Sequence, residues 1–225
     1  MTLSPASYVV NQVADRIAAM PLPGPRVAID GPDGAGKTHF ADQLAVVLRS
    51  RHRRATVRIS VDDFHNSRAV RYRQGRDSPL GFWADSYNYD RFRRDVLEPF
   101  SSGGSRRFRR AGYSHETDEI LYPDPEIAEP TAVLLVDGIF LQRVELRAQW
   151  DLTVFLDVTF TETAKRMALR DGTPSDPEDP RMRRYIEGQR EYFRQCDPQR
   201  RAHILIDNNN FDHPAILRDR TPEPG

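Results

Sequence analysis

A glycine-rich octapeptide at residues 31–38, Gly-Pro-Asp-Gly-Ala-Gly-Lys-Thr, restricts this chain to a small group of folds. It fits the pattern G-x-x-x-x-G-K-[ST], follows a short apolar run at residues 26–30, and precedes residues 38–49, where apolar side chains recur at helical spacing. Such a turn directs backbone N–H groups and the positive end of a helix dipole at phosphate oxygens. Lys37 would reach the outer phosphates, and Thr38 would offer a ligand to magnesium. We therefore expect a strand, loop and helix that bind a nucleotide.

The rest of the chain alternates apolar runs with helical patterns. Strands are predicted at residues 26–30, 55–61, 131–137, 152–158 and 202–206, and helices at 4–20, 38–49, 90–100, 161–171 and 180–196. Because the strands are apolar throughout, we expect an α/β fold in three layers, with helices on both faces of a central parallel sheet. Ligands of such sheets bind beyond the carboxyl ends of the strands. Residues 65–88 are polar and irregular, and we predict a long functional loop there.

Two carboxylates end strands at the expected ligand edge of the sheet. Asp62 follows the strand at 55–61, where a general base would accept the proton of an attacking hydroxyl and touch the magnesium shell. Asp137 ends the most apolar run of the chain, a layout that holds magnesium through water. Each has the alternative of capping a turn, and Asp157 ends a similar strand. We prefer Asp62 to its neighbour Asp63, since adjacent residues of an extended chain point in opposite directions.

Two of the 33 basic residues are lysines, Lys37 and Lys165. We interpret the lysine within the octapeptide as a position that needs an ammonium group. Arg166 and Arg170 lie one turn apart on one helix face, and Arg170 is the predicted clamp on a transferring phosphate. Most other arginines are expected to be solvated or paired with acids. Those of the polar loop are also candidates to bind an acceptor that is already phosphorylated: Arg68, Arg71, Arg73 and Arg76.

Charge and cysteine content narrow the class of protein. The formal net charge is zero, with 33 acidic and 33 basic side chains, which argues against nucleic acid or an anionic membrane as the main partner. No stretch approaches the ~18 apolar residues of a membrane span. The single Cys196 can form no internal disulfide, and Asp15 and Arg16 interrupt the N-terminal apolar residues, unlike a signal peptide. We therefore expect a cytoplasmic protein whose partner is a small molecule, with a homo-oligomer as an open alternative.

Five motifs resemble the uridine kinase and phosphoribulokinase-like P-loop kinases, in that family's order and across most of residues 26–207. They are the octapeptide at 31–38, Ile59-Ser-Val-Asp62-Asp-Phe64-His, Asp85-Ser-Tyr-Asn-Tyr-Asp90, Leu134-Leu-Val-Asp137-Gly-Ile139 and Arg166-Met-Ala-Leu-Arg170-Asp171. Many nucleotide-binding proteins share the first motif. The second and fifth motifs, at these positions, are the ones that indicate this family.

The resemblance implies transfer of the γ-phosphoryl group of ATP, with Mg²⁺, to a hydroxyl of a small-molecule acceptor. From length and residue spacing we expect one domain over residues 1–225 with an N-terminal helix at 1–22, and the resemblance implies an acceptor-binding insertion at 65–125 and a lid at 171–184. Within it, Asp137 takes the place of the family's usual glutamate. The expected catalytic residues are Lys37, Asp62, Arg166 and Arg170, and the expected metal-binding residues are Thr38, Asp62 and Asp137. The expected ATP-binding residues are Gly31, Asp33, Gly34, Ala35, Gly36, Lys37, Thr38 and His39.

The motifs determine the acceptor site less closely than the nucleotide site. Asp85 matches the aspartate that holds a ribose in uridine kinases, and His65, Phe108 and Tyr113 are expected beside it. Phe108 and Tyr113 fall where those enzymes place an aromatic and a histidine, and the segment 175–180 is acidic where the family's lid is basic. Uridine or cytidine is the leading acceptor, with pantothenate, glycerate, nicotinamide riboside or a sugar phosphate as alternatives.

The residues also speak against two other classes of protein. A module that senses ATP without an acceptor would need no base beside an open cleft, so Asp62 and the polar loop after it speak against it. A GTPase switch would need an Asn-Lys-x-Asp motif, which neither lysine of the chain supplies.

Overall fold

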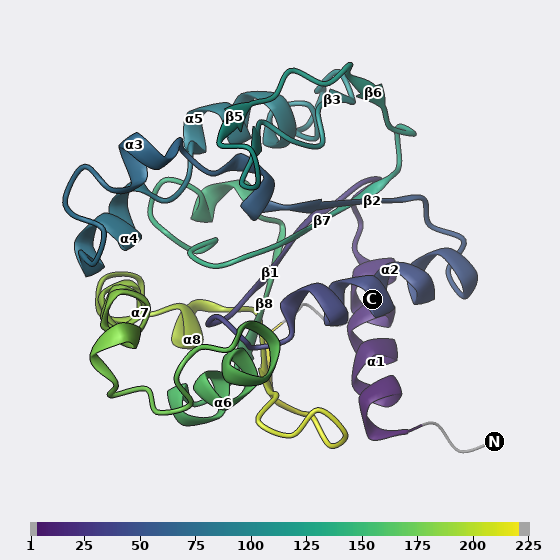
Figure 1. Ribbon diagram of the computed structural model, residues 1–225. Coiled ribbons are helices and arrows are strands. Elements are labelled where there is room, and N and C mark those ends of the chain that lie inside the picture. The colour runs from purple at the N-terminus through teal and green to yellow at the C-terminus, as the bar shows by residue number, and fades with distance from the viewer. Residues whose placement is uncertain (1–3, 221–225) are drawn as a thin grey trace.

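The computed structural model describes residues 4–220 (Figure 1) and contains one six-stranded sheet in the order β10-β9-β8-β1-β7-β2. Five strands are parallel and lie within the predicted ranges or one residue beyond them: β1 (Arg26–Asp30), β2 (Thr56–Ser60), β7 (Val133–Asp137), β8 (Leu152–Asp157) and β9 (Ile204–Asp207). The sixth, β10 (Ala215–Asp219), pairs antiparallel with β9. The sequence pattern does not predict β10, because its side chains alternate between exposed and half-buried and form no apolar run.

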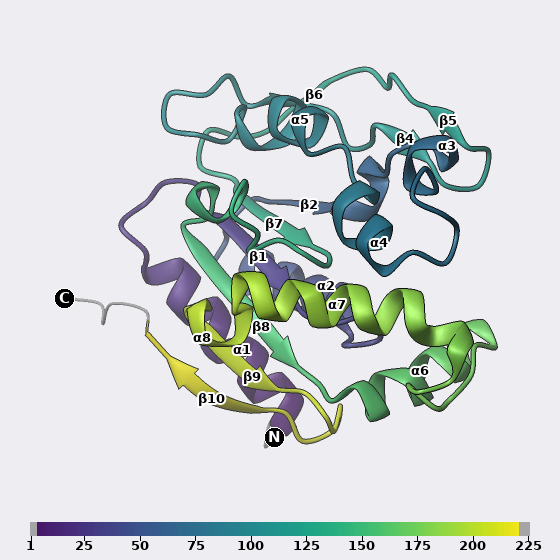
Figure 2. The same ribbon diagram turned by 90° about the vertical axis from the view of Figure 1, so that its left-hand side faces the viewer.

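Helices cover both faces of the sheet, as predicted. In β1, Val27 and Ile29 pack in one core with α1 (Pro5–Ala19) and α2 (Lys37–Ser50), whereas Ala28 faces a second core. Successive side chains of a strand point to opposite faces, so the two cores lie on opposite sides of the sheet. Tyr192 and Cys196 of α7 (Arg183–Cys196) belong to the second core, which places α7 opposite α1 and α2 (Figure 2). This is the three-layer α/β fold.

Residues 65–125 depart from the predicted long loop. After a turn of 3₁₀ helix at Val61–Phe64, three short helices follow, α3 (Arg68–Arg71), α4 (Pro79–Asp85) and α5 (Tyr89–Phe92). The predicted helix at 90–100 is α5, which continues as a π-helix over Arg93–Leu97. The expectation of a loop at 65–88 is therefore wrong, because α4 is capped by Ser78 and buries Phe82 and Trp83 despite its polar neighbours.

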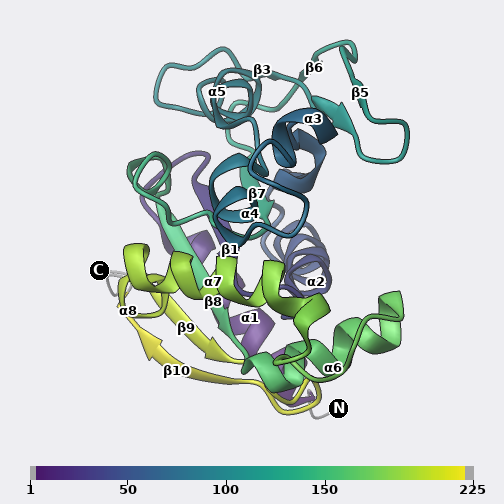
Figure 3. The same cartoon turned by 60° about the vertical axis from the view of Figure 1, so that its left-hand side comes forward.

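The insertion continues as two small antiparallel sheets. One pairs β3 (Arg107–Phe108) with β6 (Glu126–Ile127), and the other pairs β4 (Tyr113–Ser114) with β5 (Glu119–Ile120). On the other side of α7 lies α6 (Phe160–Asp171), whose Ala164 and Met167 pack against Met182 and Ile186. In Figure 3, α7 lies between the insertion and α6. Short helical segments at Arg147–Gln149, Pro180–Met182 and α8 (Pro198–Arg201) complete the chain.

Candidate active site

The glycine-rich loop joins β1 to α2 and turns through two left-handed residues. Gly34 has φ 74° and Gly36 has φ 85°, values that glycine adopts without steric cost. A Cβ at Gly36 would also lie 2.5 Å from the Phe211 ring. At the start of α2, the first N–H groups have no partner within the helix and are free to bind an anion. The loop therefore has the conformation that its sequence predicts.

Asp30 supports the loop from within the core. Its Oδ1 accepts a hydrogen bond from the Gly31 N–H at 2.8 Å, and Oδ2 accepts one from the hydroxyl of Tyr192. Gln142 Nε2 lies 3.3 Å from the same Oδ2. Burial raises the pKa of Asp30 to about 6, while the hydrogen bonds and Lys37 act in the opposite direction.

Two distant side chains hold the loop from outside. Gln189 of α7 accepts a hydrogen bond from the Asp33 N–H at 2.8 Å, and Asn208, just after β9, donates to the Ala35 carbonyl at 2.8 Å. Both side chains are buried at less than a tenth of their full exposure. No local sequence signal marks Gln189 or Asn208, because their partners are more than 150 residues away along the chain.

Two of the three expected metal-binding side chains, Thr38 and Asp137, meet at the end of β7. Thr38 Oγ1 donates to Asp137 Oδ2 at 2.7 Å, and Lys37 Nζ donates to the Pro32 carbonyl at 2.7 Å. Burial raises the pKa of Asp137, and Arg58, whose Nη2 lies 3.0 Å from Oδ1, is the strongest influence in the other direction. The hydroxyl and carboxylate oxygens are hard ligands of the kind that Mg²⁺ takes in proteins.

These residues fit magnesium held together with a nucleotide. Within residues 4–220 no group of three or more His, Cys, Asp or Glu side chains is arranged to hold a metal ion. Magnesium characteristically takes one or two protein carboxylates and completes its shell with phosphates and water. The pair formed by Thr38 and Asp137 suits that mode and not a cage built by protein alone.

Asp62 lies in the 3₁₀ turn after β2, where the Ser60 hydroxyl accepts from its N–H at 3.3 Å. Its Oδ1 accepts a hydrogen bond from Tyr87 at 2.7 Å. Burial and the neighbouring Asp62 raise the pKa of Tyr87 well above its usual range, so this phenol remains a donor. Asp63 is different, because burial together with Asp62 and Asp137 raises its pKa to about 6.

One cavity of about 370 Å³ is lined by all the predicted metal-binding and catalytic residues and by six of the eight predicted ATP-binding residues, the exceptions being Gly31 and Ala35. It opens at the carboxyl ends of β1, β2 and β7, the edge at which parallel sheets bind ligands. Its walls are Asp33, Gly34, Gly36, Lys37, Thr38, His39, Asp62, Asp137, Gly138, Arg166, Arg170 and Phe211.

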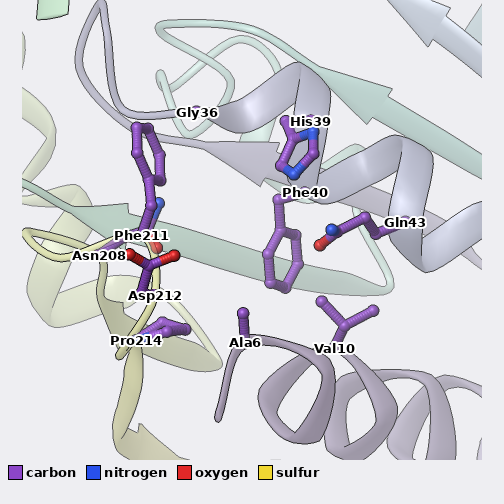
Figure 4. A pocket seen from close by; sticks show the side chains of 10 residues that line it. All are labelled: Ala6, Val10, Gly36, His39, Phe40, Gln43, Asn208, Phe211, Asp212 and Pro214. Carbon is purple, nitrogen blue, oxygen red and sulfur yellow. The ribbon is translucent and has the colours of Figure 1, made fainter. Parts of the chain in front are cut away.

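A second cavity of about 410 Å³ adjoins the first and shares Gly36, His39 and Phe211 with it. Figure 4 shows Phe211, from the loop between β9 and β10, and Phe40, from α2, on opposite sides of it. The remaining walls are Ala6, Val10, Gln43, Asn208, Asp212 and Pro214. An apolar cleft with a few polar groups at its rim suits a planar ring.

The two predicted arginines of α6 have different surroundings. Arg166 pairs with Glu162 at 3.1 Å, donates to the carbonyls of Asn208 and Asn209, and lies 3.6 Å over the Phe211 ring. Arg170 is exposed and pairs with the adjacent Asp171 at 2.7 Å. Arg166 therefore braces the loop beyond β9, whereas Arg170 has a surface partner that it can exchange.

Of the predicted acceptor residues, His65 lies close to Asp62, whereas Asp85 is occupied by other side chains. His65 lies beside Asp62, with Nδ1 2.6 Å from the Asp62 carbonyl, and its ring is 4.5 Å from that of Tyr87. Asp85 is buried, and both of its oxygens are engaged by Arg73 and Gln74.

Phe108 is a predicted acceptor residue, but the structure does not bring it to the site. Its ring is buried in the core, 5.4 Å from that of Phe100. Tyr113 is also buried, and its hydroxyl donates to Asp118, but its ring lies 6.4 Å from that of His65 and its hydroxyl accepts from Arg71 at 3.2 Å. Alternation in β3 turns the Phe108 ring inward, which a pattern of scattered aromatics does not reveal.

A chain of contacts links Asp62 through His65 to His115 and to Arg71, one of the loop arginines predicted as candidates to bind a phosphorylated acceptor. The His115 ring lies 5.1 Å from that of His65, and His115 Nε2 lies 2.8 Å from Arg71 Nη1. Burial lowers the pKa of both histidines. Arg71 is itself buried, at 5% exposure.

Comparison with protein families gives a match over most of the domain. A family model described as the phosphoribulokinase/uridine kinase family matches residues 27–173. A sequence comparison with curated proteins finds no match. Within residues 4–220, no helix is both long and apolar enough to cross a membrane.

Solved structures of similar fold include kinases of several acceptors. A Bacillus stearothermophilus protein described as a possible uridine kinase aligns with a TM-score of 0.69 at 22% identity, over 87% of this chain and 96% of that chain. A phosphoribulokinase from Rhodobacter spheroides aligns with a TM-score of 0.56 at 18% identity, over 82% and 70%. A D-glycerate 3-kinase from Cryptococcus neoformans aligns at 0.53 and 14%, over 86% and 87%. At these identities the likeness concerns the fold alone.

Proposed function

This chain belongs to the phosphoribulokinase and uridine kinase family, and we propose that it transfers the γ-phosphoryl group of ATP to a hydroxyl group of a small-molecule acceptor. The observation that carries the proposal is the single cavity that joins the glycine-rich loop, Lys37, Asp62, Asp137 and Arg170. A nucleotide sensor would not need Asp62 oriented by Tyr87 at the mouth of that cavity.

The donor nucleotide occupies both cavities in this proposal. The phosphates lie on the loop and on the N–H groups at the start of α2, and the base lies in the adjoining cleft between Phe211 and Phe40. Thr38 and Asp137 hold magnesium, which neutralises charge on the phosphates when it is bound. Lys37 exchanges the Pro32 carbonyl for the outer phosphates.

Asp62 is the general base of the proposal. The hydrogen bond from Tyr87 fixes the carboxylate through Oδ1, and Oδ2 receives none from the side chains of the described residues. Oδ2 is thus the atom that accepts the proton of the acceptor hydroxyl. Arg170 leaves Asp171 to stabilise the charge of the transferring group.

The acceptor suggested first by the sequence is a pyrimidine nucleoside, uridine or cytidine. Two observations weaken that choice. Asp85, expected to hold a ribose, already accepts from Arg73 and Gln74, and Phe108 lies in the core. A nucleoside would have to displace Arg73 from Asp85.

Arg71 favours a second class, an acceptor with a carboxylate or phosphate group. Among residues 4–220 Arg71 forms no ion pair, and its guanidinium contacts His115 Nε2 at 2.8 Å and the Tyr113 hydroxyl at 3.2 Å. Its Nε is buried without a hydrogen-bond partner. The carboxylate of Asp118 is linked to Arg71 only through the Tyr113 hydroxyl, so an anionic ligand that contacts the guanidinium directly would stabilise this buried cation. Glycerate, pantothenate and sugar phosphates have such a group, whereas uridine and cytidine do not.

ADP release with Mg-ATP over uridine, cytidine, nicotinamide riboside, pantothenate, glycerate and a sugar phosphate tests the proposal. We expect turnover with one acceptor, lost in Asp62→Asn and in Lys37→Met. For an anionic acceptor, Arg71→Gln raises the KM of the acceptor and leaves that of ATP unchanged. ATP binding without turnover for any acceptor would contradict the kinase and favour the sensor.

A further inference from the structure

Arg58 lies in the middle of β2 and reaches two elements of the phosphate site. Its Nη2 is 3.0 Å from Asp137 Oδ1 at the end of β7. Its Nη1 is 3.4 Å from Asp42 Oδ1 and donates to the Thr38 carbonyl at 3.2 Å, both on α2. The arginine side chain is 18% exposed and that of Asp137 is 2% exposed. A permanent cation therefore contacts the buried carboxylate that is expected to serve a metal.

The contact between Arg58 and Asp137 leaves that carboxylate partly unused. Asp137 Oδ2 accepts from Thr38, but Oδ1 is buried and has no hydrogen-bond partner, although Arg58 is 3.0 Å away. The pair is thus a contact of charges without a directed hydrogen bond.

The charges around Asp137 show how Arg58 affects the attraction of divalent cations to this site. Asp62, Asp63 and Asp137 influence one another electrostatically, and Lys37 is drawn to the Pro32 carbonyl. Without Arg58, this edge of the sheet would attract a free divalent cation whether or not nucleotide is bound. With Arg58 in place, the charge of Asp137 is balanced internally.

We propose that Arg58 is a positioning residue that acts as the internal counter-ion of Asp137 and weakens the binding of free divalent cations, so that magnesium enters together with the nucleotide phosphates. The inference rests on the proposed function for the identity of the metal site. A merely structural role is the alternative, since the same contacts also tie β2 to α2 and β7.

Mn²⁺ binding to the nucleotide-free protein, followed by the electron paramagnetic resonance signal of free Mn²⁺, tests the proposal. Arg58→Gln removes one unit charge beside the site, and we expect it to tighten Mn²⁺ binding by about 3- to 30-fold. Arg58→Lys keeps the charge, and we expect it to bind Mn²⁺ with the affinity of the parent. Arg58→Met is a second neutral variant in case the glutamine variant does not fold.

Arg26→Gln is the matched control. Arg26 forms a comparable half-buried pair with Asp151 at 3.2 Å, but at the opposite end of the sheet. It should change thermal stability without changing Mn²⁺ affinity. If the folded Arg58→Gln or Arg58→Met protein binds Mn²⁺ no more tightly than the parent, or if neither parent nor variant binds measurably, the counter-ion role is wrong and the pair is structural.

The result is separable from the test of the proposed function. Tighter Mn²⁺ binding in Arg58→Gln supports the inference even when no acceptor in the panel is phosphorylated. Turnover of an acceptor with unchanged Mn²⁺ affinity in the variants supports the kinase and overturns the role of Arg58.

Discussion

Asp62 and Asp63 are adjacent carboxylates with different surroundings. Asp62 lines the phosphate cavity and accepts from Tyr87, whereas Asp63 is not among the residues that line it. The sequence separates the two only through the alternation of an extended chain. The 3₁₀ turn that begins at Val61 is what turns Asp62 toward the cavity.

We expect Asp62→Asn to lower kcat by about 100- to 10,000-fold, the range of a lost general base, with little change in the KM of ATP. Asp63→Asn is the matched control and should stay within a few-fold of the parent. Steady-state kinetics with the acceptor found in the panel measures both. Equal losses in the two variants would mean that local charge matters and that no single base is used.

Asp30 gives the folding stability a pH dependence of defined sign. Burial raises its pKa from 3.8 to about 6, so between those values the folded protein keeps a proton that the unfolded chain has lost. The free energy of unfolding contributed by this group therefore falls as the pH rises through that window. Asp30→Asn cannot titrate, so the stability difference between parent and variant should shift by about 1–3 kcal/mol in favour of the variant from pH 4 to pH 7. Urea unfolding at several pH values measures it, and a constant difference would refute the prediction.

At the residue scale, the sequence predicts the position of site residues that end strands, and it does not predict those that reach the site from other elements. Lys37, Asp62 and Asp137 are placed by their own flanking runs. Gln189 and Arg58 reach the site from a helix surface and a strand centre, and their partners are set by tertiary packing. The catalytic or binding roles of all five residues stay predictions.

At the scale of elements, α4 and α7 show why the sequence pattern of residues 65–88 does not predict a helix there. The apolar residues of α4 form a short run bounded by polar residues on both sides, and a seven-residue helix has too few turns for a periodic signal. Packing against α7 stabilises it instead. That close approach depends on Gly188, since a Cβ there would lie 2.7 Å from the Phe82 ring and 2.9 Å from the Pro79 carbonyl.

Gly188→Ala should therefore destabilise the protein by about 1–2 kcal/mol, because the overpacking cost exceeds the helix propensity that alanine gains. The matched control is Gly81→Ala in α4, where the nearest atom would lie at 3.4 Å. That change should be neutral or stabilising by up to about 1 kcal/mol. Thermal unfolding of both variants is the measurement. Destabilisation by Gly81→Ala and not by Gly188→Ala would show that α4 is positioned differently.

At the scale of the molecule, the parallel sheet and its two covered faces follow from the apolar strands, and so does the edge at which the cavity opens. The insertion over residues 65–125 does not follow, because its two small sheets have two-residue strands and its core is shared with α7. The edge strand β10 is missed for a related reason. It is added antiparallel to β9 by backbone pairing, with little apolar burial to mark it.

The distribution of amines gives the whole chain a built-in reference for chemical labelling. Apart from the α-amino group, the sequence has two amines, those of Lys37 and Lys165. Lys37 lies in the phosphate cavity, and Lys165 lies on α6, where its exposed amine is 3.9 Å from Glu162. Reductive methylation read by mass spectrometry should therefore report on only two side chains. We expect Mg-ATP to protect Lys37 several-fold while Lys165 is modified at an unchanged rate. Equal protection of both would indicate a rearrangement of α6, and protection of neither would place the phosphates elsewhere. Occupancy of the site thus becomes a ratio of two peaks from one protein, without a tag or a coupled enzyme.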